Sequence, residues 1–171
     1  MRKKYIDFYM DVARRTAQLS YAKKLKVGSI IVKDDSIISY GYNGTPPKWD
    51  NVAEDKVWLT KEAASFLTEE EIETEFPYVE YSDYDPTVVI GRYYLKTRDE
   101  VIHAEMNSLA KLAKSSFSGK DSIMFITHSP CLQCAKGIYT AGISEIYYQV
   151  PYKCDHGIEF LNKCGVKVVK V

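Results

Sequence analysis

The sequence predicts a three-layer α/β/α sandwich built on a five-stranded mixed sheet. Two observations support this fold class: a strand–turn–strand pattern near the N-terminus, and an alternation of strands and helices from residue 122 to the end. The 171 residues favour a single domain and are ample for a sizeable hydrophobic core.

An amphipathic helix and a β-hairpin account for the N-terminal part of the chain. Apolar residues recur at helical spacing over about 3–22, which predicts a helix there. The β-branched run 27–32 predicts a strand that is buried on both faces. After a turn at Asp34 and Asp35, residues 36–42 predict a second strand that pairs with the first in antiparallel fashion.

The segment of about 48–99 has no clear hydrophobic period and is expected to be a long variable insertion in a single domain, 1–171. Two short helices are predicted within it, near 60–66 and at 69–75, the second capped by Thr68. A connection of this length inside a compact domain is usually functional or faces a partner.

Beyond this segment, the chain predicts regular α/β units. Residues 103–114 are strong helix formers. Strands and helices then alternate, joined by short loops, and a glycine lies at the end of each of these helices. The predicted strands are 122–127, 143–148 and 166–171, and the predicted helices are 131–142 and 155–165. Such strand–helix–strand units are parallel and right-handed, which completes the mixed sheet.

The composition argues against a nucleic-acid partner, a membrane span and secretion. Lys and Arg total 23, as do Asp and Glu, so the chain is neutral, and binding to long nucleic acid is disfavoured. No apolar run reaches the roughly 20 residues of a membrane span, and no secretory signal is visible, so we expect a cytoplasmic protein that does not enter a membrane. The four cysteines then indicate reduced thiols or metal ligands.

The chemistry-bearing residues are His103-Ala104-Glu105 and Pro130-Cys131-Leu132-Gln133-Cys134. Cys131 and Cys134 are three apart at a predicted helix start, where both sulfurs share one side and the helix dipole favours thiolate. His103 supplies a third ligand, and three protein ligands leave one zinc position for water. Glu105 is then placed to take a proton from that water.

Neither element is decisive alone, because a lone C-x-x-C can be a redox pair or half of a structural site. Together they match the H-x-E and P-C-x-x-C pattern of zinc nucleobase deaminases. Three blocks, KVGSIIVKDDSIISYGYNGTP (26–46), EVIHAEMNSL (100–109) and FITHSPCLQCAKGIYTAGI (125–143), resemble the deoxycytidylate (dCMP) deaminase family, especially its bacteriophage members, within the zinc-dependent cytidine deaminase superfamily.

This resemblance implies a cytidine deaminase-like fold and hydrolytic conversion of dCMP to dUMP for thymidylate synthesis. It implies that Glu105 is the proton carrier and that the backbone N–H of Ala104 binds the pyrimidine carbonyl. It also implies that Asn43 contacts the sugar and that Tyr152 lines the nucleotide pocket. Some members of the superfamily carry a second zinc on cysteines before the H-A-E motif; no cysteine precedes Cys131, so one zinc per chain is expected.

The resemblance further implies regulation and assembly. In this family the G-Y-N-G loop, here Gly41, Tyr42, Asn43 and Gly44, helps to form a nucleotide site between subunits where dCTP activates and dTTP inhibits. Glycines there suit a backbone that approaches a base or takes positive φ. Lys24 and its neighbours offer charge to the triphosphate, with Mg²⁺ as a bridge. A homohexamer is expected by the same analogy.

Three alternatives stay open at this point. The enzyme could also accept dCTP. A deaminase acting on tRNA or on single-stranded nucleic acid shares the zinc site, but calls for a basic, aromatic-lined track. A zinc-stabilised binding module calls for a fourth protein ligand and gives Glu105 no role.

Overall fold

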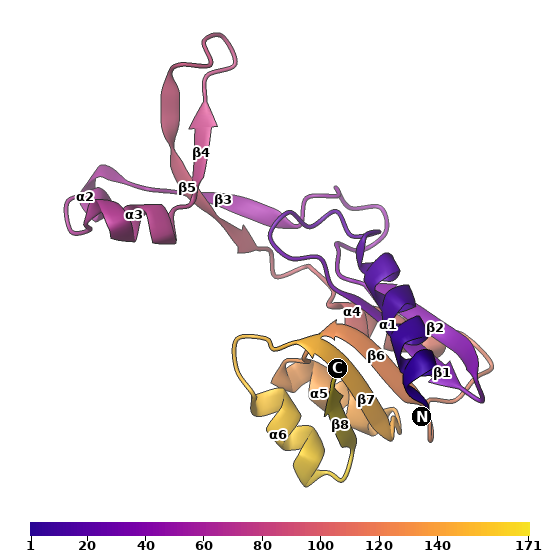
Figure 1. The fold of residues 1–171 in the computed structure, drawn as a ribbon. Helices are drawn as coiled ribbons and strands as arrows, with labels where there is room; N and C mark the ends of the chain where they lie inside the picture. The colour runs from indigo at the N-terminus through magenta and orange to yellow at the C-terminus, as the bar shows by residue number, and fades with distance from the viewer. The chain divides into compact units, whose positions relative to one another are not determined.

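The computed structural model describes residues 1–171, which form two compact units (Figure 1). The first unit comprises Met1–Asn51 and Glu100–Val171, and the second comprises Val52–Asp99. No helix combines the length and the apolar character needed to cross a membrane.

The first unit contains the predicted five-stranded mixed sheet, in the order β2-β1-β6-β7-β8. Its strands are β1 (Gly28–Lys33), β2 (Ser36–Tyr42), β6 (Ile123–His128), β7 (Glu145–Val150) and β8 (Lys167–Lys170). β1 pairs in antiparallel fashion with β2 and β6, whereas β6, β7 and β8 are parallel. Asp34 and Asp35 both take positive φ, as a tight two-residue hairpin turn requires.

Helices cover both faces of this sheet, so the three predicted layers are confirmed. Alternate residues of β1 point to opposite faces, and two buried clusters follow from this alternation. Ile30 and Val32 pack with α1 (Lys3–Ala17), and Ile31 packs in the cluster that α4, α5 and α6 cover. These three helices span Ala104–Leu112, Leu132–Thr140 and His156–Lys163.

Helix α1 ends at Ala17, five residues before the predicted end. No glycine or proline marks this end in the sequence; it is set by tertiary contacts. The Ser20 hydroxyl donates to the carbonyl of Asn43 and accepts from the amide of Ala22, which draws the chain out of the helical path. An ideal Cβ at Gly28 would lie 2.3 Å from the Ala13 carbonyl oxygen, so β1 and α1 pack in direct backbone contact.

The second unit is a three-stranded antiparallel sheet with two short helices. The strands β3 (Glu54–Trp58), β5 (Val89–Thr97) and β4 (Tyr78–Tyr81) lie in that order. The helices α2 (Lys61–Ala64) and α3 (Glu69–Glu75) confirm the two that were predicted, and Thr68 forms a capping box with Glu71.

The three strands of this unit were missed by the sequence prediction. Their side chains do not alternate between a buried and an exposed face, because few of them are buried at all: Ala53, Glu54, Phe76 and Leu95 are the buried residues of the unit. Aromatic contacts across the strands support the sheet instead. The ring of Tyr93 lies 5.2 Å from that of Trp58 and 5.4 Å from that of Tyr78.

Candidate functional site

His103, Cys131 and Cys134 form a cluster of metal-ligating side chains. The ligand atoms of the three residues all lie within 4.8 Å of one another. The Nδ1 atom of His103 is 3.7 Å from the Cys131 sulfur and 3.4 Å from the Cys134 sulfur. The structure therefore brings together the three residues that the sequence singles out as zinc ligands.

Two helix starts place these side chains. His103 is the N-cap of α4 and Cys131 is the N-cap of α5, while Cys134 lies in the first turn of α5. The first N–H groups of a helix lack intrahelical partners, and its N-terminus carries partial positive charge. Both features favour anionic sulfur at this point.

The surroundings shift the pKa values of the two thiols in opposite directions. Hydrogen bonds from Cys134 and His103 lower the pKa of Cys131 to about 3. The hydrogen bond to Cys131, followed by burial, raises the pKa of Cys134. The two thiols therefore differ in acidity, and a divalent cation would supply the charge that lets both become thiolates.

The donor set fits zinc. Two sulfurs and one imidazole nitrogen are the ligands of catalytic zinc sites that have three protein ligands and one open position. Cys134 is buried, Cys131 is half-buried and His103 is exposed, so the cluster can be reached from solvent on the histidine side.

Glu105 adds a buried carboxyl group next to the cluster. It lies in the first turn of α4 and is only 4% exposed. Burial raises its pKa to about 7, and the mutual influence of Glu105 and Cys134 on each other's pKa places the carboxyl group beside the thiol. A carboxyl group with a pKa near neutrality can both accept and release a proton at physiological pH.

Ala104 and Tyr152 lie close to these helix starts. Ala104 is fully buried and is the first residue of α4, where backbone N–H groups have no intrahelical acceptor. The amide of Tyr152 donates to the hydroxyl of Ser129, 2.7 Å away, two residues before Cys131. Tyr152 is thus anchored beside the loop that enters α5.

The structure places the amide side chain of Asn43 on the backbone of the loop that precedes β1. Its Nδ2 donates to the Leu25 carbonyl and its Oδ1 accepts from the Val27 amide, both at 2.8 Å. The backbone amide of Asn43 also donates to the Val27 carbonyl. Asn43 therefore clips residues 25–27 to the end of β2, a structural role that the sequence did not indicate.

The remaining residues of the G-Y-N-G loop join β2 to α4. Gly44 forms an isolated bridge with Ile102, the residue before His103. The Tyr42 carbonyl accepts from Asn107 of α4 at 2.8 Å. Asn107 was missed from the sequence, although it lies one helical turn after His103 and so faces the same way.

The expected reason for the two glycines is partly wrong. Neither Gly41 nor Gly44 takes positive φ. Gly41 is required because α4 approaches it: an ideal Cβ would lie 2.2 Å from the Ala104 carbonyl oxygen, whereas a Cβ at Gly44 meets nothing within 4 Å. Lys24 lies exposed on the loop after α1.

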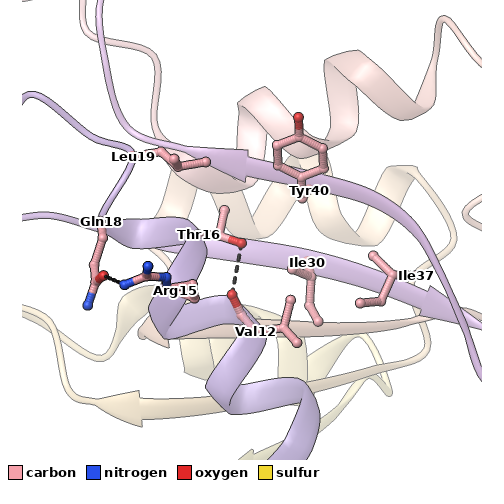
Figure 2. A pocket seen from close by; sticks show the side chains of 8 residues that line it. All are labelled: Val12, Arg15, Thr16, Gln18, Leu19, Ile30, Ile37 and Tyr40. Carbon is pink, nitrogen blue, oxygen red and sulfur yellow. Dashed lines mark hydrogen bonds between the residues drawn. The ribbon is translucent and has the colours of Figure 1, made fainter.

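A separate groove lies on the α1 face of the sheet and contains none of the residues singled out above (Figure 2). It encloses about 560 Å³. Its lining comes from α1, the residues after α1, β1 and β2: Val12, Arg15, Thr16, Gln18, Leu19, Ile30, Ile37 and Tyr40. Since α4 and α5 cover the opposite face, the groove is not part of the metal cluster.

Known proteins resemble the chain over almost its whole length. A family model described as the cytidine and deoxycytidylate deaminase zinc-binding region matches residues 3–150. The deoxycytidylate deaminase of Enterobacteria phage T2 is 30% identical over 172 residues, covering 95% of this chain and 89% of that protein. The human deoxycytidylate deaminase is 30% identical over 143 residues, covering 83% of this chain and 62% of that protein.

Among solved structures, the dCMP deaminase of cyanophage S-TIM5, in complex with dCMP and dUMP, superposes with a TM-score of 0.74. The two sequences are 33% identical, and the match covers 100% of this chain and 99% of the cyanophage chain.

Proposed function

Because the chain belongs to the cytidine and deoxycytidylate deaminase family, we propose that it is a zinc-dependent dCMP deaminase that hydrolyses dCMP to dUMP and ammonia. The observation that carries this proposal is the convergence of His103, Cys131 and Cys134 beside the buried carboxyl group of Glu105. The similar phage enzyme was solved with dCMP and dUMP, the substrate and product of this reaction.

Each site residue has a distinct role in the proposed reaction. His103, Cys131 and Cys134 would hold a zinc ion, which would lower the pKa of a bound water to about 7. Glu105 accepts a proton as the water oxygen bonds to C4 of cytosine, and delivers that proton to N3. Glu105 then passes the second water proton to the 4-amino group, the C4–N bond breaks, and ammonia leaves.

Three further residues bind the nucleotide in this proposal. The N–H of Ala104, at the start of α4, donates to the pyrimidine carbonyl oxygen. Asn43 contacts the sugar with the Nδ2 hydrogen that its bond to Leu25 does not use. Tyr152, anchored on Ser129, lines the nucleotide pocket.

Ammonia release from a substrate panel tests the proposal. The panel is dCMP, deoxycytidine, cytidine, CMP, dCTP and a cytosine-containing single-stranded oligonucleotide, with zinc measured in the same preparation. We expect dCMP to be the best substrate and deoxycytidine to be much poorer, because cationic groups that pair the 5′-phosphate are left unpaired without it. Preferential deamination of the oligonucleotide would replace dCMP with a nucleic-acid substrate.

Regulation and assembly form the second part of the proposal. dCTP activates and dTTP inhibits, each with Mg²⁺, at a site built by Gly41, Tyr42, Asn43, Gly44 and Lys24 in a homohexamer of cytoplasmic enzyme. The bridge from Gly44 to Ile102 supports this proposal, since it links the loop directly to the residue before His103. An effector must bind the active and inactive states with different affinity to shift the rate.

A further inference from the structure

A hydroxyl group of β1 and one of α4 itself meet the first turn of α4. Ser29 of β1 has its Oγ 2.8 Å from the Ala104 carbonyl oxygen and 2.9 Å from the Oγ of Ser108. The Oγ of Ser108 in turn lies 2.8 Å from the Glu105 carbonyl oxygen. Ser29 and Ser108 are both fully buried, so no solvent competes for these bonds.

The number of hydroxyl hydrogens limits which contacts can be hydrogen bonds. Each serine has one hydroxyl hydrogen, and three contacts are within bonding distance. Each carbonyl receives a donor when Ser29 donates to Ala104 and Ser108 donates to Glu105. The two carbonyl groups that begin α4 therefore gain a second donor beside their intrahelical one.

The β2 strand holds the next turn of α4 from a second direction. Ser39, itself buried, donates to the Ser108 carbonyl at 2.7 Å. Gly41 leaves no space for a side chain between β2 and the backbone of Ala104 and Ser108. The position of these two turns along and around the helix axis is thus set by small residues of the hairpin.

We propose that Ser29 and Ser108 are positioning residues for the deamination: through the carbonyl groups of Ala104 and Glu105 they fix the Ala104 N–H and the Glu105 carboxyl group relative to the substrate. This inference rests on the proposed function, because Ala104 and Glu105 act on dCMP there. Neither serine touches the substrate; each acts through the backbone that it holds.

The test compares Ser29→Ala with a matched control, Ser122→Ala. Ser122 is also fully buried and donates its hydroxyl to a backbone carbonyl, that of Gly119, at 2.6 Å, but its hydrogen bonds reach no residue of α4. Both variants lose one buried hydrogen bond, so both should lower the melting temperature by a similar amount. Only Ser29→Ala should lower kcat, by about tenfold, while KM for dCMP changes less than about twofold. Misplaced catalytic groups reduce the stabilisation of the transition state more than they reduce the binding of the substrate.

Two further measurements keep the inference testable on its own. Hydrogen exchange of the peptide spanning α4 should quicken in Ser29→Ala and stay at the wild-type rate in Ser122→Ala, whether or not the protein deaminates dCMP. Zinc content should equal that of the wild type in both. Where Ser29→Ala does not fold, Ser108→Ala serves, since alanine favours the helix and offsets the lost bond.

The outcomes separate the two proposals. A wild-type protein that releases no ammonia from dCMP overturns the proposed function, while the exchange data still decide the role of Ser29. Wild-type kcat and wild-type α4 exchange in Ser29→Ala, or equal loss of kcat in Ser122→Ala, overturns the positioning role.

Discussion

Replacing Gly41 with alanine tests how tightly the hairpin seats the helix that carries the site. The added Cβ would lie 2.2 Å from the Ala104 carbonyl oxygen and 2.4 Å from the Ser108 amide nitrogen, and real Cβ atoms essentially never come within 3.0 Å of such neighbours. Both obstructing atoms are helix backbone and cannot rotate away. Strand β2 and helix α4 must therefore separate by about 0.8 Å, the difference between 3.0 and 2.2 Å.

This displacement has two measurable consequences. Overpacking of a well-packed core costs about 1–3 kcal/mol, which in a chain of this size lowers Tm by roughly 2–12 °C. A shift approaching 1 Å in a helix that carries reacting groups lowers the rate by up to about 100-fold. We therefore expect Gly41→Ala to lose between about 10-fold and 100-fold in kcat on dCMP.

Thermal unfolding and initial-rate assays on Gly41→Ala and Gly44→Ala check this reasoning. Gly44 belongs to the same G-Y-N-G loop, but a Cβ there meets nothing within 4 Å and its φ is negative. We expect Gly44→Ala to stay within about 0.5 kcal/mol of the wild type. Wild-type Tm and kcat in Gly41→Ala, or equal damage in both variants, would refute the argument that close approach rather than loop flexibility requires Gly41.

Four further predictions concern the metal, the carboxyl group and the loop. Plasma emission spectrometry should find about one zinc per chain. Cys131→Ala or Cys134→Ala should lose the zinc together with stability; zinc retained when both cysteines are replaced would contradict this ligand set. Glu105→Gln should keep zinc but lose about 10²- to 10⁴-fold in kcat, so a near-normal turnover number would remove its role as proton carrier. In zinc-free protein, the raised pKa of Glu105 means that its ionisation destabilises the fold as pH rises from 4.5 to about 7. In urea unfolding, Glu105→Gln should therefore gain stability relative to wild type over that window. A stability difference between the two proteins that does not change with pH would contradict the raised pKa. Asn43→Ala leaves two backbone groups without their partner and should cost about 1–3 kcal/mol in urea unfolding, besides abolishing any response of the initial rate to dCTP and dTTP; an unchanged unfolding midpoint would argue against the clip.

Local sequence patterns predicted most of the first unit, because its elements are determined by short-range features. The β-branched run of β1 and the turn at Asp34 and Asp35 predict the hairpin without reference to the rest of the chain. Gly142 and Gly165 take positive φ after α5 and α6, as helix-ending glycines do. The end of α1 was not predictable in this way, since the Ser20 hydroxyl reaches Asn43, 23 residues away.

The metal cluster was predictable for a related reason, and the loop contacts were not. Cys131 and Cys134 share one helical turn, so their spacing alone places both sulfurs on one side. Asn43 has one side-chain hydrogen-bond partner 16 and another 18 residues away, and an exposed loop asparagine gives the same sequence signal as a clipped one. The strands of Val52–Asp99 were missed because a sheet with little buried surface lacks the alternation that strand prediction uses.

Topology explains why two distant helix starts meet. Strand β1 is antiparallel to both β2 and β6, so β2 and β6 run in the same direction and end at the same edge of the sheet. Helix α5 begins just after β6, with Cys131 as its N-cap. The bridge between Gly44 and Ile102 brings the start of α4, with His103 as its N-cap, to the end of β2. The imidazole and the thiols therefore converge at the carboxyl ends of two strands, the edge where α/β sheets bind ligands. The bridge at Gly44 and the seat of α4 on Ser29 and Gly41 are therefore the contacts that hold the two helix starts together.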